Sequence, residues 1–190
     1  PYTQVGCTGT LFQLTVTVKP TATVNNKTQI ICSEASFLLT PTNDGTDIIP
    51  SNTTYTWVPV ANANITGAVQ QNVGQANISQ SLTNITSGIQ TQTYTITPVL
   101  QNACSAASFT AAITVKPKPR IVNMISTVCS ETAFSASPVD GAGTNLVPSN
   151  TLYTWIVGSN GNLLGQSDQN IAQASIGQTL SNSTSITQPI

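Results

Sequence analysis

Few side chains of this protein could do acid–base chemistry, and they recur in pairs. Glu34 and Glu131 each follow a Cys-Ser dipeptide. A glycosidase-type site needs two carboxylates side by side, and residues 21–117 add only Asp44 and Asp47 to Glu34. The chain contains no histidine, so its many hydroxyl groups lack the usual general base. We therefore expect no catalytic residue, and we predict that the protein is not an enzyme.

The same acidic residues are too few to hold a metal ion. Calcium takes about six to eight oxygen ligands, several of them from carboxylates. Asp44 and Asp47 share one loop, whereas the matching loop contains only Asp140. Zinc is not favoured either, because the chain has no histidine and no closely spaced cysteine pair. We expect Glu34 and Glu131 to cap turns, and we predict neither a metal nor another cofactor.

Four cysteines occupy two recurring positions. Cys32 and Cys129 each follow a pair of strand-forming residues, and Cys7 and Cys104 lie in turns flanked by Gly or Ala. Two cysteines per repeat indicate a disulfide framework in an oxidising compartment. We favour a Cys32–Cys104 bridge within the repeat, which closes a loop of about 70 residues and would contribute roughly 4 kcal/mol in the chain-entropy model. The alternative pairs Cys7 with Cys32 and Cys104 with Cys129 across the junctions.

Two Tyr-Thr-Trp triplets contain the largest side chains. Tyr55 and Trp57 return as Tyr153 and Trp155. Such rings could stack on sugars, but β-sandwiches commonly bury a tryptophan on the third strand, and the identical placement favours a structural role in the core. An indole face open to solvent would favour a carbohydrate-binding module, and a buried indole would favour a spacer.

An internal repeat of about 97 residues positions all of these side chains. The Pro-Ser-Asn-Thr motif of residues 50–53 returns 98 residues later, and the Cys-Ser-Glu motif of residues 32–34 returns 97 residues later. A one-residue insertion near residues 141–143 reconciles the two offsets. A regular period of this length indicates an array of like units rather than one globular enzyme.

The register of the repeat predicts three parts. Residues 1–20 match residues 98–117 and are expected to be the C-terminal strand or strands of a preceding repeat. Residues 21–117 form one complete repeat, and residues 118–190 form the N-terminal part of the next. We expect the chain to be a piece of a longer tandem array.

Each repeat is expected to fold as a β-sandwich. Apolar and polar residues alternate with a period of two, as at residues 12–18, which is typical of half-buried strands. Seven short strands in about 97 residues indicate a β-sandwich. The predicted strands lie near residues 22–31, 35–40, 53–60, 64–70, 76–83, 91–99 and 107–116. Because seven is odd, the chain should enter one end and leave at the other, and prolines at the junctions should stiffen the connection.

Composition limits the partners. Only 6% of the residues are charged, against about 25% in ordinary domains, and Ser, Thr, Asn and Gln fill 82 of 190 positions. The net charge is −1 and there is no basic patch, which disfavours nucleic acid. No apolar run approaches the roughly 20 residues that cross a bilayer, so we expect no membrane insertion in this segment. Since three of the five basic residues precede proline, only Lys27 and Arg120 are ordinary cleavage sites for trypsin-like proteases.

The order of these motifs resembles the PKD-like repeats of giant surface proteins in Bacteroidetes. Along the chain come Ile-Cys-Ser-Glu, Pro-Ser-Asn-Thr-x-Tyr-Thr-Trp, Leu-Thr-Asn, Thr-Tyr-Thr-Ile-Thr-Pro, a Cys turn and Thr-Val-Lys-Pro. The matching residues are 30–34, 50–57, 82–84, 93–98, 104 and 114–117. One departure is that Glu34 and Glu131 stand where such repeats often have glycine.

The resemblance implies an immunoglobulin-like sandwich with a non-catalytic role. Proteins of this kind are adhesins, some of them gliding-motility adhesins, exported by type IX secretion and held at the cell surface on the outer membrane. We expect a stalk or spacer segment of such an adhesin. Its partners would be neighbouring repeats, surface polysaccharide and the secretion machinery. The alternative functions are a carbohydrate-binding module and accessory repeats carried by a secreted enzyme.

Overall fold

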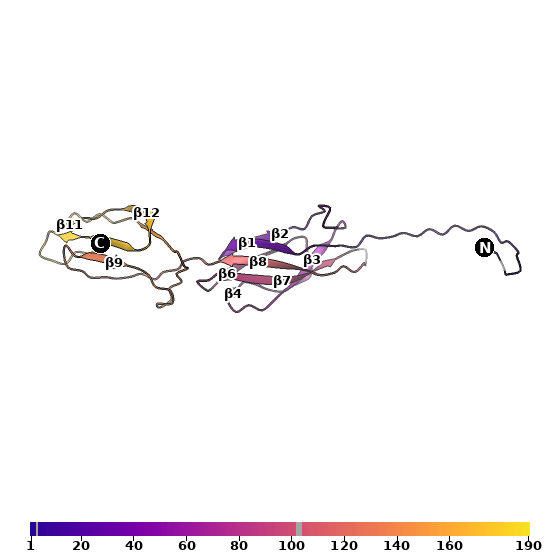
Figure 1. Cartoon of the computed structure of the whole chain (residues 1–190), viewed down its shortest axis with the longest axis horizontal. Helices are drawn as coiled ribbons and strands as arrows, with labels where there is room; N and C mark the ends of the chain where they lie inside the picture. Colours follow the sequence, from indigo (N-terminus) through magenta and orange to yellow (C-terminus); the bar gives the residue numbers. More distant parts are fainter. Residues whose placement is uncertain (3, 102–103) are drawn as a thin grey trace.

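The computed structural model describes residues 1–2, 4–101 and 104–190, and within them every regular element is a β-strand (Figure 1). The expectation of an all-β chain is confirmed. Two groups of strands follow one another, joined by a narrow connection, after an extended N-terminal segment. The first group is β1 (Lys27–Cys32), β2 (Ala35–Leu39), β3 (Thr54–Pro59), β4 (Ile65–Thr66), β5 (Gln71–Gln75), β6 (Ile78–Asn84), β7 (Gln90–Val99) and β8 (Phe109–Lys116). The second is β9 (Ala133–Ala136), β10 (Tyr153–Trp155), β11 (Leu163–Leu164), β12 (Gln169–Gln173), β13 (Ile176–Thr179) and β14 (Ser181–Asn182).

The first group forms two facing sheets. One has the order β1-β8-β7-β3-β5 and the other β2-β6-β4. In β7 and β8, the longest strands, alternate residues are buried between the sheets, as a period of two requires. The fully buried side chains between them include Phe37, Ile78 and Leu82 from the smaller sheet and Tyr94, Ile96 and Ile113 from the larger. This arrangement is consistent with an immunoglobulin-like sandwich.

The first and last strands of this group run in the same direction. β1 pairs with β8 in parallel over six residue pairs, from Lys27 opposite Ala111 to Cys32 opposite Lys116. The chain therefore enters at one end, here called the leading end, and leaves at the other, the trailing end. The sequence argument from an odd number of strands was wrong, because the group has eight strands. The chain enters and leaves at opposite ends because its first and last strands are parallel.

Of the strand predicted at residues 64–70 only the two residues of β4 form, and β5 at residues 71–75, which was not predicted, belongs to the other sheet. β4 pairs with β6, whereas β5 pairs with β3. Between them Gly67 has φ +91°, and a Cβ there would clash with the carbonyl oxygen of Ser81. Only glycine adopts this conformation readily. The chain changes sheets at Gly67.

The second group has fewer paired strands than the first, but β10 and β12 pair in the same register as β3 and β5. Tyr153 and Trp155 lie opposite Gln173 and Gln169, as Tyr55 and Trp57 lie opposite Gln75 and Gln71. A turn is repeated too. The N–H of Ile49 donates to Asn43 six residues earlier (2.7 Å), and that of Val147 donates to Asp140 seven residues earlier (2.8 Å). The additional residue of the second copy therefore lies in this loop.

The second group lacks a counterpart of β1. Residues 124–129 match β1 in sequence but form no strand, and Ile125 is 97% exposed. In the first group the neighbour of β1 is β8. Among the described residues, nothing takes the place of β8 beside residues 124–129.

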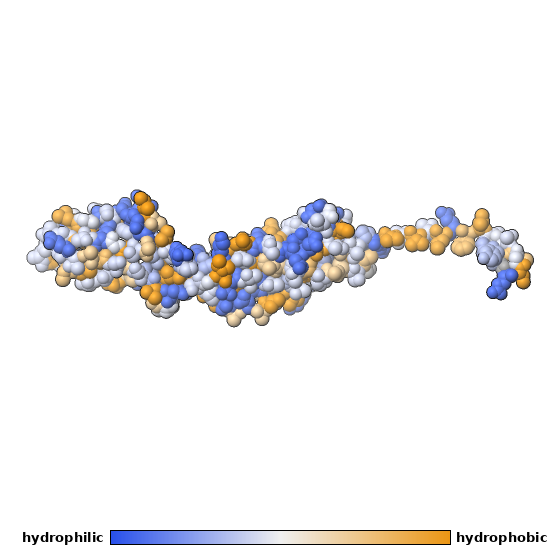
Figure 2. Space-filling view, in the orientation of Figure 1, coloured by the Kyte–Doolittle hydropathy of each residue, from blue (hydrophilic) through white to orange (hydrophobic). Residues whose placement is uncertain are grey.

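Residues 9–20 form no strand, although their alternation predicts a half-buried one. Phe12 is 77% exposed, whereas its counterpart Phe109 in β8 is buried. Figure 2 shows the extended N-terminal segment as a line of hydrophobic residues open to solvent. No other part of the described chain pairs with these residues as a strand, which is why the expected burial does not occur.

Candidate functional site

The aromatic residues of β3 lie inside the sandwich. Tyr55 is 2% exposed and Trp57 is 4% exposed. Trp57 lies opposite Ile96 in β7, and the Tyr55 ring meets Phe109 edge-on with centroids 6.3 Å apart. Burial raises the pKa of the Tyr55 hydroxyl. Neither ring presents a face on which a sugar could stack.

The corresponding residues of the second group, Tyr153 and Trp155 on β10, are half-buried. In the first group, β3 is covered along its other edge by β7. β10 pairs only with β12 among the described strands. Their extra exposure therefore reflects a missing neighbour strand rather than a shaped binding groove.

The predicted Cys32–Cys104 disulfide is contradicted by the structure. Cys32 is a free, exposed thiol at the trailing end, opposite Lys116. Cys104 precedes β8 at the leading end, where the neighbouring Ser105 carbonyl accepts a hydrogen bond from the Thr21 hydroxyl (2.6 Å). β8 has eight residues and spans roughly 25 Å at about 3.3 Å per residue. A disulfide needs Cα atoms within about 7 Å.

The alternative pairings across the junctions do not form either. Cys129 is, like Cys32, a free and exposed thiol, so neither Cys104–Cys129 nor Cys7–Cys32 is bonded. The sequence shows which cysteines recur, but it does not show at which end of the sandwich each one lies.

The two carboxylates of the loop at residues 43–49 are both engaged by the protein. Asp44 Oδ1 accepts hydrogen bonds from the N–H of Asp47 (2.9 Å) and from the hydroxyl and N–H of Thr46 (2.8 and 3.0 Å). These bonds lower the pKa of Asp44 to about 2. This is a turn cap.

Asp47 is buried and forms an ion pair with Lys27 on β1 (2.6 Å). Its Oδ1 also accepts from the N–H of Asn25 (2.9 Å). Burial opposes ionisation, but the bond from Asn25 and the charge of Lys27 together outweigh it and lower the pKa of Asp47. The pair therefore attaches the loop to β1.

No metal-binding cluster is evident in the part of the chain that the structure describes. Nowhere there do three His, Cys, Asp or Glu side chains come together. The described residues also contain no helix that could cross a membrane.

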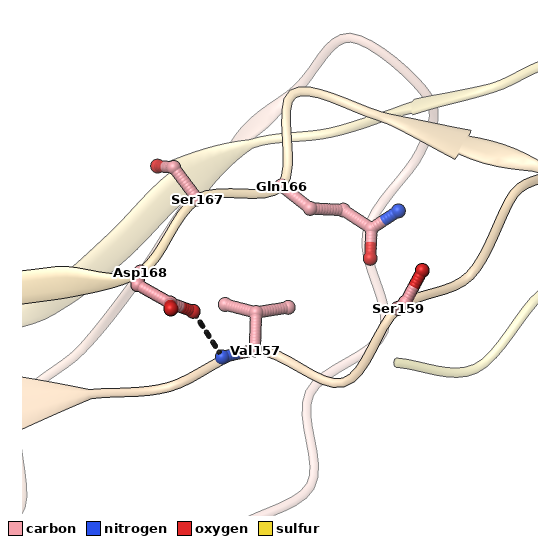
Figure 3. A pocket seen from close by; sticks show the side chains of 5 residues that line it. All are labelled: Val157, Ser159, Gln166, Ser167 and Asp168. Carbon is pink, nitrogen blue, oxygen red and sulfur yellow. Dashed lines mark hydrogen bonds between the residues drawn. The ribbon is translucent and has the colours of Figure 1, made fainter.

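A hollow of about 370 Å³ lies in the second group (Figure 3). Its lining residues are Val157, Ser159, Gln166, Ser167 and Asp168. Its one carboxylate, on Asp168, accepts a hydrogen bond from the N–H of Val157 (2.8 Å). The hollow therefore lies between residues 157–159 and 166–168, and the carboxylate in its lining is already engaged by a backbone N–H.

The contacts between the two groups form a site that the sequence did not predict. The Lys118 ammonium lies 2.5 Å from the Glu34 carboxylate, and the Ser87 hydroxyl lies 2.5 Å from that of Asp140. The bond to Glu34 raises the pKa of Lys118. A groove of about 230 Å³ adjoins the first of these contacts and is lined by Ser33, Glu34, Thr83, Asn84, Ile85, Lys118, Pro119, Arg120 and Leu146.

One sequence signal could have pointed to this site. Both copies have glutamate directly after Cys-Ser, at a position whose φ of +70° glycine adopts most readily. Glu34 was expected to cap a turn, but its carboxylate pairs with Lys118. A glutamate in such a turn, in both copies, indicates a role for its side chain.

Comparison with known proteins gives a match to a family model. The model of the PKD-like domain family matches residues 29–119. This match covers β2–β8 and most of β1. No curated protein matches the chain. No solved structure matches it.

Proposed function

We propose, on the premise that residues 29–119 form a PKD-like domain, that this chain is a stalk segment of a large cell-surface adhesin. Residues 21–117 and 118–190 would be successive sandwich modules, and residues 1–20 would supply the last strand of a module before them. The role is non-catalytic: the modules hold a binding tip away from the cell, and adhesion gains from many copies that engage together.

The observation that carries the proposal is the parallel pairing of β1 with β8. A module whose chain enters at one end and leaves at the other adds its own length to whatever precedes and follows it. A sandwich whose termini met at one end would add bulk but little reach. The internal repeat of register and turn contacts supports the division into like modules.

Surface chemistry supports an extracellular spacer. PKD-like domains are usually extracellular, and the uncharged, amide- and hydroxyl-rich surface gives no long-range attraction to nucleic acid or anionic lipid. The finer part of the proposal rests on the resemblance to gliding-motility adhesins of Bacteroidetes. It comprises type IX export, attachment at the outer membrane, a contribution to gliding, and contacts with neighbouring repeats, surface polysaccharide and the secretion machinery.

The proposal can be tested by measuring height above a membrane. The chain is displayed on cells from an outer-membrane anchor at its N-terminus, with one epitope inserted after residue 20 or after residue 117. The second epitope should stand farther from the membrane by about 3 nm, the length of the β8 strand with its turns. Equal heights would show that the module does not extend the chain and would refute the spacer role.

The carbohydrate-binding alternative has a separate test. The 190-residue protein is titrated with a panel of polysaccharides while tryptophan fluorescence and heat are recorded. The spacer predicts no saturable change, because Trp57 is buried and Trp155 lies in no shaped groove. A saturable signal lost in Trp155→Leu but kept in the matched variant Leu152→Ala would replace the spacer with a binding module.

A further inference from the structure

Glu34 occupies a strained backbone conformation in the turn between β1 and β2. Its φ is +70°, and Glu131 in the second copy has φ +67°. For residues other than glycine this left-handed region is unfavourable, and such strain persists where something compensates for it. Both copies keep glutamate where glycine would fit freely, and in both a backbone hydrogen bond, from Glu34 to Leu82 and from Glu131 to Leu180, holds the turn, so the side chain stays available for a contact.

The turn is fixed at the trailing end of the sandwich. The N–H of Glu34 donates to the carbonyl of Leu82 (2.8 Å), and that of Ser33 donates to the carbonyl of Lys116 (2.8 Å). These bonds hold the backbone, so the exposed carboxylate of Glu34 projects from a rigid base. Two residues beyond Lys116, the Lys118 ammonium meets it at 2.5 Å.

A second contact lies on a different turn. Ser87, between β6 and β7, donates to Asp140 of the second group (2.5 Å). Beside the contact between Glu34 and Lys118, Ile85, Pro119 and Leu146 belong to the lining of the groove. Two separated contacts restrict both the bending and the rotation of the second group relative to the first, whereas one contact alone would leave rotation about it free.

We propose that the Ser33–Glu34 turn is a docking site for the Lys-Pro segment that begins the next module, and that it fixes the orientation of successive modules. The inference rests on the proposed stalk. Its counterpart, Ser130–Glu131, presents the same site to a further copy. The backbone of Glu131 is held as that of Glu34 is: its N–H donates to the carbonyl of Leu180 (2.7 Å), and its side chain is exposed.

The contact between Glu34 and Lys118, here called the clasp, is effective because both residues belong to one chain. Glu34 and Lys118 are both more than half exposed, so their attraction is screened by water and salt and adds little to folding. The short segment between β8 and Lys118 keeps the partners at high effective concentration. A weak contact is then sufficient to select one orientation of the second group.

The test measures the distance distribution between the two groups. Spin labels are attached through a noncanonical amino acid at Asn72 on β5 and at Asn170 on β12, corresponding exposed positions, so the native cysteines stay untouched. Glu34→Gly removes the carboxylate and relieves the strain. Glu131→Gly is the matched control, since it relieves the same strain where the described chain offers no partner for it.

Glu34→Gly should at least double the width of the distance distribution, and Lys118→Met should do the same. Glu131→Gly should leave the width unchanged. Sodium chloride at about 1 M, where the Debye length is about 3 Å, should broaden the wild type but not Glu34→Gly. Both glycine variants should unfold at no lower temperature than the wild type, which shows that the fold survives.

Two results would overturn the clasp: Glu34→Gly as narrow as the wild type, or Glu131→Gly as broad as Glu34→Gly. With either result the mean distance between the two labels would still be long, and the proposed stalk would still stand. A short mean distance in every variant, from a compact molecule, would refute the stalk itself. The failure of the clasp is therefore distinguishable from the failure of the proposed function.

Discussion

At the scale of single residues, the two copies show how a buried charge is exchanged for a neutral group. In the first group Asp47 accepts from the N–H of Asn25 and pairs with Lys27. In the second, Asn145 accepts from the N–H of Val122 at the same distance, 2.9 Å, and Met124 stands where Lys27 does. The hydrogen bond is kept while both charges disappear together, as expected when a buried charge is tolerated only with its partner.

Removing one partner should therefore destabilise the protein more than removing both. We expect Lys27→Met to lower the free energy of unfolding by about 2–3 kcal/mol, somewhat less than for a fully buried pair because Lys27 is partly exposed. The double variant Lys27→Met/Asp47→Asn should recover to within about 1 kcal/mol of the wild type. Urea unfolding of the full chain measures both. A double variant less stable than the single one would contradict this account.

The same pair determines a pH dependence. The pKa of Asp47 is lowered in the folded state, so its contribution to stability is present above its unfolded pKa of about 3.9 and is lost as the pH falls through the folded value. The free energy of unfolding should fall more steeply below pH 4 in the wild type than in the double variant. Asp44, whose pKa is about 2, contributes in the same direction to both proteins. If the free energy of unfolding fell equally steeply with pH in both proteins, the pH dependence would not come from the pair of Asp47 and Lys27.

At the scale of elements, one glycine decides where the chain passes from one sheet to the other. Gly67 combines a φ of +91° with the close approach of the Ser81 carbonyl, and Gly165 repeats both features. Gly88 has neither, because an added Cβ there would meet open space. The transition from β4 to β5 therefore depends on a backbone that only glycine permits.

Gly67→Ala should lower the free energy of unfolding by at least about 2 kcal/mol, since the methyl group meets backbone in a conformation that alanine rarely adopts. Gly88→Ala, the matched control, should change it by less than about 0.5 kcal/mol. Urea midpoints of the two variants check the difference. Equal effects would show that Gly67 is not required at the transition.

The sequence predicted the strands whose side chains alternate, but not how those strands are ordered. The regular alternation in β7 and β8 was enough to locate them. The parallel pairing of β1 with β8 joins segments about 80 residues apart and leaves no local pattern. The wrong disulfide has the same origin, because the ends on which Cys32 and Cys104 lie follow from strand direction. The Glu34–Lys118 contact likewise exists only once the turn and the junction have folded.

At the scale of the whole molecule, the connection between the two groups is narrow and accessible. Arg120 is exposed and lies outside any strand: its backbone makes an isolated bridge to Leu146, and its guanidinium donates to the Thr144 carbonyl (3.4 Å). Lys27, the other ordinary tryptic site, lies within β1 and is paired with Asp47. Cleavage requires a locally open backbone, which strand pairing opposes.

Trypsin should therefore cut first after Arg120, and the fragment of residues 1–120 should resist further digestion. Mass spectrometry of a short digest identifies the products. In Arg120→Gln this first cut should be absent and the intact chain should persist. A first cut after Lys27 would mean that the first group is opened more easily than the connection.

The central claim is that the two groups lie end to end in an extended molecule (Figure 1). Small-angle X-ray scattering of the protein in solution tests it most directly. A compact chain of 190 residues would have a radius of gyration of about 16 Å and one symmetric maximum in its pair-distance distribution. The account predicts a clearly larger radius and a second maximum from distances between the groups. A radius near 16 Å with a single maximum would contradict it.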